Sequence, residues 1–125
     1  MSLRILVVDD SPFMRATLVR AITEQGWEVA AEASNGKQAI ARYQELRPDV
    51  VTMGITMPVM DGLSALKAIM MSDPAARIIM CSAAGLPRNI EAAIAAGAKT
   101  FLVKPFRDSD IVQAILAVME LPLAS

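Results

Sequence analysis

Apolar positions follow two patterns along this chain, short unbroken runs and longer stretches with helical spacing. Unbroken runs are typical of strands buried on both faces, and helical spacing is typical of amphipathic helices that cover a sheet. The runs predict strands at 4–8, 28–33, 50–53, 77–82 and 100–104. The other pattern predicts five helices: from Pro12 to before Gly26, from near Asn35 to Leu46, from Gly62 to Met71, from Pro87 to before Gly97, and from near Asp108 to before Pro122.

Polar residues at the element ends support these boundaries. Ser11 can cap the first helix with Pro12 at its first position, and Asn35 with Gln38 resembles a capping box for the second. Asp61-Gly62 is a turn signal, and Glu28 and Glu32 place charge on one face of the second strand. The second strand therefore belongs near a sheet edge.

Strands that alternate with helices over short loops define an α/β domain. We expect one doubly wound (βα)5 domain over residues 1–125, with a parallel five-stranded sheet in the flavodoxin-like order 2-1-3-4-5. In such a sheet the carboxyl ends of the strands meet at one rim, where ligands bind. The residues brought there would be Asp9, Asp10, Gly54, Ser82 and Lys104.

The amino-acid composition excludes several classes of function. The chain has no histidine, which excludes His-based acid-base catalysis and Ser-His triads, and its single cysteine, Cys81, lies in an apolar run typical of a buried residue. A net charge of -1 gives no basic surface for nucleic acid or for a membrane. With no hydrophobic signal segment or membrane-length apolar run, we expect a cytoplasmic protein whose partner is another protein.

The rim residues suggest phosphate and metal chemistry. Adjacent carboxylates such as Asp9 and Asp10 repel each other unless a cation lies between them, and oxygen ligands of this kind suit Mg²⁺. Lys104 would neutralise a phosphoryl group nearby, and Ser82 would donate a hydrogen bond to it.

Four motifs carry a family resemblance: Asp9-Asp10, the segment from Met57-Pro58 to Asp61-Gly62, Ser82-Ala83, and Lys104-Pro105-Phe106. In this order on a βα pattern they resemble the CheY-like receiver domain of two-component response regulators, over essentially the whole chain. The resemblance implies a signalling domain that acts by protein-protein interaction in a phosphorelay and is not an enzyme. It also implies a sensor histidine kinase or another signalling protein as partner, bound through the fourth-helix, fifth-strand, fifth-helix face.

The resemblance also implies residue roles. Asp10 would bind Mg²⁺ directly, Asp9 through water, and the backbone carbonyl of Thr56 would be a further ligand. Ser82 would be the switch hydroxyl, Lys104 the phosphate-pairing lysine and Phe101 the aromatic switch. The Lys104-Pro105 bond would be cis.

One departure from the family changes the prediction. The family places its phosphoacceptor aspartate where this chain has Gly54, and glycine has no carboxylate to carry a phosphoryl group. The chain is therefore predicted to be non-phosphorylatable there, as a pseudo-receiver or as a variant whose aspartate was replaced. Mg²⁺ affinity should fall, and Lys104 should pair with Asp9 or Asp10 instead.

Other interpretations stay open. Gly54 could serve an unusual backbone angle at a strand end, and Lys104 could be an ordinary surface lysine. The same fold could hold a flavin or a nucleotide, or could be a purely dimerising module. We expect a monomer or weak dimer. With no acceptor, the domain should be mostly in the inactive conformation, with Phe101 turned outward and Ser82 away from the site.

Overall fold

The computed structural model describes residues 2–83 and 87–120. Its strands are β1 (Arg4–Val8), β2 (Glu28–Ala33), β3 (Val50–Gly54), β4 (Ile78–Ser82) and β5 (Thr100–Val103). Its helices are α1 (Pro12–Glu24), α2 (Gly36–Leu46), α3 (Gly62–Ser72), α4 (Pro87–Ala95) and α5 (Asp108–Val118). Each predicted element is present within a few residues of its expected bounds. The expected stop at Pro122 and most of the small-residue loop before Pro87 lie outside the described residues.

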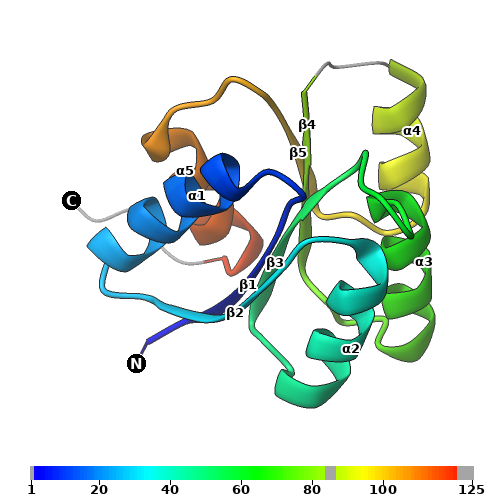
Figure 1. Cartoon of the computed structure of the whole chain (residues 1–125), viewed down its shortest axis with the longest axis horizontal. Coiled ribbons are helices and arrows are strands. Elements are labelled where there is room, and N and C mark those ends of the chain that lie inside the picture. The colour runs from blue at the N-terminus through cyan, green and yellow to red at the C-terminus, as the bar shows by residue number, and fades with distance from the viewer. Residues whose placement is uncertain (1, 84–86, 121–125) are drawn as a thin grey trace.

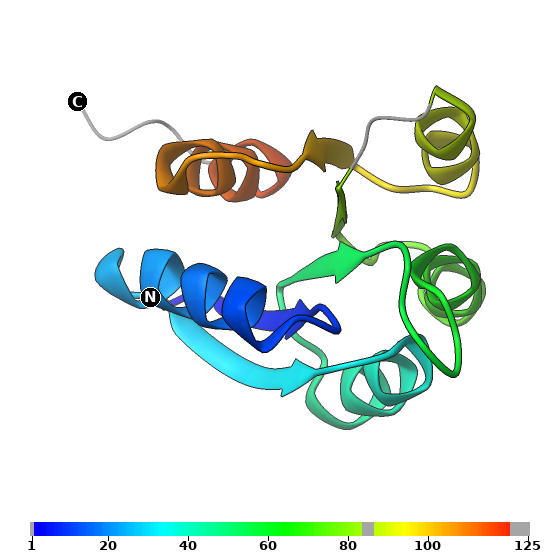
Figure 2. The ribbon, with the colours of Figure 1, turned by 45° about the horizontal axis from the view of Figure 1, so that its top comes forward.

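The five strands form one parallel sheet in the order β2-β1-β3-β4-β5, which confirms the predicted flavodoxin-like topology. Helices α1 and α5 cover one face, and α2, α3 and α4 cover the other (Figure 1). Figure 2 shows the same two layers of helices from another direction. The strand order changes direction between β1 and β3, so the loops after these two strands frame the rim where a ligand site is expected.

The core consists of two aliphatic clusters, one on each face of the sheet. Alternation along each strand divides its side chains between them: Val51 and Met53 pack toward α2 and α3, and Val50 packs toward α1 and α5. Every residue of β3 and of β4 is buried. These two strands therefore form a rigid platform for the residues at their carboxyl ends. None of the helices in the described segments is both long and apolar enough to cross a membrane.

The predicted caps are present, with one difference. The Ser11 hydroxyl accepts a hydrogen bond from the Met14 amide, and the Asn35 side chain accepts one from the Gln38 amide. The Gln38 side chain, however, accepts from the amide and hydroxyl of Ser34, not from the Asn35 amide that a capping box requires. The capping-box prediction was therefore correct for only one of its two bonds.

The loop between β3 and α3 is held by close backbone contacts. The Gly62 amide donates to the Ile55 carbonyl at 2.7 Å, and the Gly36 amide donates to the Met60 carbonyl at 2.8 Å. A Cβ atom on Gly62 would lie 1.8 Å from the Gly54 carbonyl oxygen. Gly62 is thus required by the close approach of two backbone segments.

Candidate functional site

A pocket of about 370 Å³ opens at the carboxyl ends of β3, β4 and β5. Its lining comes from loops, strand ends and the first turn of α4, which are far apart in the sequence: Asp10, Gly54, Ile55, Thr56, Cys81, Ser82, Ala83, Asn89 and Lys104. Four of the five residues predicted to meet at the rim therefore line one pocket. The fifth, Asp9, lies directly beneath, with its side chain against Gly54.

Asp9 is the most constrained residue of the site. It is buried, and each of its polar groups has a partner. Its amide donates to the Ala33 carbonyl, and its carbonyl accepts from Arg15 Nη1 at 2.6 Å. One carboxylate oxygen accepts from the Ser11 amide at 2.9 Å, and the other accepts from Lys104 Nζ at 2.6 Å. Asp9 thus links β1, β2, α1 and the end of β5.

The ion pair between Lys104 and Asp9 confirms the prediction that Lys104 pairs with Asp9 or Asp10. Only 20% of the Lys104 side chain and 2% of the Asp9 side chain are exposed. Breaking a pair in such an environment leaves a charge with neither water nor a partner, which costs several times more than breaking a surface pair. Lys104 is therefore not an ordinary surface lysine.

Gly54 does not adopt a backbone conformation that needs glycine. Among the described glycines only Gly26 and Gly97 have positive φ, and Gly54 pairs with Cys81 in the regular ladder between β3 and β4. The interpretation of Gly54 as a strand-end glycine with an unusual angle was therefore wrong. A Cβ atom on Gly54 would lie beside the ion pair of Asp9 and Lys104. It would be 3.1 Å from Asp9 Oδ2, the oxygen that Lys104 contacts. A side chain at this position would enter the site itself.

The donors for a divalent cation are present only in part. Asp10 is exposed, lines the pocket, and makes no side-chain hydrogen bond or ion pair with the described residues; Thr56 lines the same pocket. Both Asp9 oxygens already accept a hydrogen bond. The described residues include no group of three Cys, Asp or Glu side chains that could hold a metal. Asp10, with water and a carbonyl, fits a weak Mg²⁺ site, since Mg²⁺ binds through one or two carboxylates.

The remaining site residues occupy defined places. Ser82 is 7% exposed and lines the pocket, and the Lys104-Pro105 bond is cis, as the resemblance implied. Burial raises the pKa of the Cys81 thiol to about 12, which agrees with its predicted role as a buried apolar residue. Phe101 is half-buried and packs against the core cluster beneath α3 and α4. The expected inactive conformation, with Phe101 turned outward and Ser82 away from the site, stays a prediction.

Two residues at the site were missed by sequence reasoning. Arg15 contacts the Asp9 carbonyl, and Asn89 lines the pocket from α4. The Arg15 contact is to a backbone atom, so it leaves no signature in residue types. Asn89 reaches the pocket only because α4 packs beside the end of β4, which spacing alone does not specify.

The comparisons with known proteins agree with this geometry. The model of the response regulator receiver domain family matches residues 5–116. The chain is 54% identical to the chemotaxis protein CheY of Thermotoga maritima over 92% of this chain and 96% of the relative. It is 53% identical to that of Bacillus subtilis, with the same coverage of both chains. A chain of the crystal structure of the CheX-CheY-BeF3-Mg+2 complex from Borrelia burgdorferi superposes with a TM-score of 0.91 at 37% identity, over 94% of this chain and 89% of that one.

A flavodoxin-like sheet with an acidic pair, a hydroxyl and a lysine at its carboxyl rim defines a signalling domain of the phosphorelay type. The chain belongs to the response regulator receiver family, and it is CheY-like. Family membership leaves the flavin or nucleotide alternative without support.

Proposed function

We propose that this receiver domain signals by protein binding without forming an acyl phosphate at position 54. The observation that carries the proposal is the pairing at the rim: Lys104 contacts Asp9 at 2.6 Å beside a residue that has no side chain. An acyl phosphate needs a carboxylate nucleophile, and Gly54 supplies none. The domain acts as a pseudo-receiver or as a substituted receiver, not as an enzyme.

Mg²⁺ binds weakly in this proposal. Asp10 and the Thr56 carbonyl are its ligands, Asp9 contributes through water, and the carboxylate that family members carry at position 54 is missing. Fewer anionic ligands mean lower affinity for a hard cation. The ammonium group of Lys104 already neutralises Asp9, which reduces the attraction for Mg²⁺ further.

The partner is a sensor histidine kinase or another signalling protein, and it binds the surface formed by α4, β5 and α5. Ile94 and Val103 on this surface are 50% and 43% exposed, so two large apolar side chains are available to a partner. The residues that would report the state of the site, Phe101 and Lys104, belong to β5 or follow it directly. We expect a cytoplasmic monomer or weak dimer.

Intact-mass measurement after incubation with acetyl phosphate and Mg²⁺ tests the proposal. The chain should gain no phosphoryl group, and Gly54→Asp, which restores the nucleophile between Asp9 and Lys104, should gain one. Gly54→Asn is the matched control, because its side chain has the same size but cannot be acylated.

One result would contradict the proposal, and another would change its explanation. One is a stoichiometric phosphoryl group on the unchanged chain, which would point to Ser82, Thr56 or one of the acidic pair as an acceptor. The other is an unmodified Gly54→Asp variant that is folded, which would mean that the rest of the site is unable to support the transfer.

A further inference from the structure

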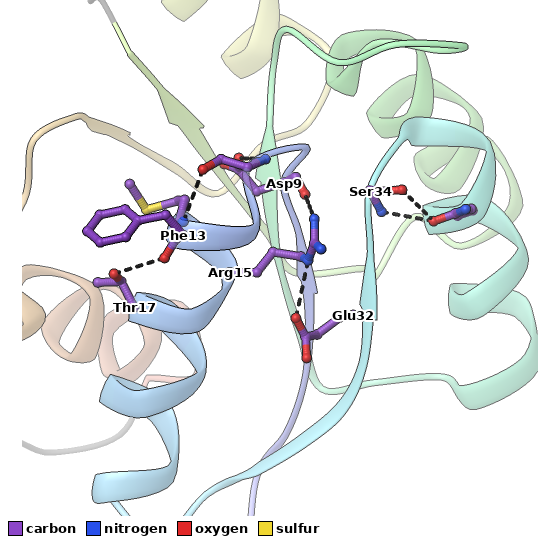
Figure 3. Close-up of polar contacts among 9 residues, drawn as sticks. Asp9, Phe13, Arg15, Thr17, Glu32 and Ser34 are labelled. Carbon is purple, nitrogen blue, oxygen red and sulfur yellow. Dashed lines mark hydrogen bonds and ion pairs between the residues drawn. The ribbon is translucent and has the colours of Figure 1, made fainter.

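Arg15 is the one side chain from a helix that reaches the backbone of the acidic turn, here residues 9–11, within the part of the chain that the structure describes. Its Nη1 donates to the Asp9 carbonyl at 2.6 Å, and its Nε lies 3.2 Å from Glu32 Oε1 on β2. Figure 3 shows the guanidinium group between these two partners. Arg15 thereby connects α1 to the residue that follows β1 and to β2.

The geometry suits an arginine specifically. The guanidinium group is planar and rigid, so fixing one edge on Glu32 fixes the direction of the N–H that meets the Asp9 carbonyl. The Arg15 side chain is 20% exposed, less than half the 49% of Glu32. A lysine offers a single flexible ammonium group and does not hold two partners in a fixed plane.

The hydrogen bond to the Asp9 carbonyl orients Asp10. The carbonyl of Asp9 and the amide and Cα of Asp10 lie in one peptide plane, so holding the oxygen sets the direction in which the next residue leaves. The other atoms of Asp9 are already bound to Ala33, Ser11 and Lys104. Rotation of this plane would turn Asp10, and the hydrogen bond from Arg15 opposes that rotation.

We propose that Arg15, supported by Glu32, is a positioning residue that directs the Asp10 carboxylate into the rim pocket by holding the Asp9 carbonyl. The part of this inference that concerns Mg²⁺ rests on the proposed function. A helix-to-strand ion pair with no further role would stabilise the fold and leave Asp10 unaffected.

Two NMR measurements separate these roles. The first is hydrogen exchange of the Ser11 amide, which is bound to Asp9 and reports the turn without any metal. The second is the Mg²⁺ dissociation constant from the shift of the Asp10 amide. Arg15→Met keeps the apolar stem and removes the donors. Arg20→Met is its matched control, since Arg20 is also on α1 but pairs with Asp108 at 3.5 Å.

Arg15→Met should accelerate Ser11 exchange and weaken Mg²⁺ binding by about 10-fold or more, as expected when a partner of a metal ligand is lost. Arg15→Lys should recover part of both effects, Glu32→Gln should cause a smaller loss, and Arg20→Met should change neither. Equal exchange and equal Mg²⁺ affinity in Arg15→Met and Arg20→Met would overturn the inference. If Mg²⁺ binding to the unchanged chain is too weak to measure, Ser11 exchange decides, and it does so whether or not the chain accepts a phosphoryl group.

Discussion

Gly54 and Gly62 are both buried glycines at the site, but they differ in what a methyl group would meet. At Gly54 the nearest atom is a side-chain oxygen 3.1 Å away, and at Gly62 it is a backbone oxygen 1.8 Å away. We expect Gly54→Ala to change the free energy of unfolding by less than about 1 kcal/mol. Alanine loses less conformational entropy on folding than glycine, and this gain offsets the cost of a small movement of Asp9. Gly62→Ala should cost about 3 kcal/mol or more.

Urea denaturation of the two variants measures this difference. A Gly54→Ala variant as unstable as Gly62→Ala would mean that position 54 requires glycine for the fold, and that its residue type carries no information about phosphorylation.

Val59 is a strained residue on the rim. It has a φ of 69° in a three-residue turn in which the Met60 amide donates to the Pro58 carbonyl, and β-branched residues rarely adopt this conformation. Its side chain is 78% exposed, so little packing is lost on removal. We expect Val59→Gly to raise the free energy of unfolding by about 1 kcal/mol, since relief of strain exceeds the added entropy of the unfolded chain. An increase in urea midpoint confirms it, and a decrease contradicts it.

Thr52 has a buried hydroxyl for which the described residues provide no hydrogen-bond partner. An unsatisfied buried polar atom destabilises a fold, and valine has nearly the same shape without the hydroxyl. Thr52→Val should therefore raise the free energy of unfolding by about 1 kcal/mol in thermal or urea denaturation. A loss of stability would mean that the hydroxyl has a bound water as its partner.

At the scale of elements, Tyr43 on α2 and Asp73 after α3 join two helices. The Tyr43 hydroxyl donates to Asp73 Oδ2 at 2.6 Å, and Arg47 lies beside both residues. Burial, together with this bond, raises the pKa of Tyr43, and the bond from Tyr43 is the main cause that lowers the pKa of Asp73 below its ordinary value of 3.8.

Because the Asp73 pKa is lower in the folded chain, its contribution to stability is present above pH 3.8 and is lost as the pH falls through the folded value. Tyr43→Phe should cost about 1 kcal/mol at neutral pH through the lost hydrogen bond. Its stability should also fall less steeply with acid than that of the unchanged chain. Urea denaturation from pH 7 to about pH 2.5 measures both curves, and parallel curves would contradict the assignment.

The elements themselves could be predicted from sequence because their signals are local. The apolar runs of β3 and β4 and the caps at Ser11 and Asn35 each depend on a few adjacent residues. The Gln38 contact with Ser34 was not predicted, because either of two neighbouring backbone amides could donate to the Gln38 side chain without changing the sequence pattern.

At the scale of the whole molecule, the rim was predictable because parallel strands bring their carboxyl ends together whatever the side chains are. The topology placed Asp10, Gly54, Ser82 and Lys104 in one pocket. What it did not specify was the direction of each group. The choice of Asp9 over Asp10 by Lys104 and the backbone contact of Arg15 depend on orientations that only the packed structure fixes.

A receiver without an acceptor should keep one conformation when a phosphodonor is added. In the proposed function, the state of the rim would reach the α4, β5 and α5 surface through Lys104 and Phe101, so a donor would change this surface only by altering the charge that Lys104 meets. Amide spectra of the unchanged chain with acetyl phosphate and Mg²⁺ should shift only around Asp10 and Thr56. In Gly54→Asp the shifts should extend along β4 and β5, because a new anion competes with Asp9 for Lys104. Shifts across β5 in the unchanged chain would mean that Mg²⁺ or the donor biases the domain without covalent chemistry.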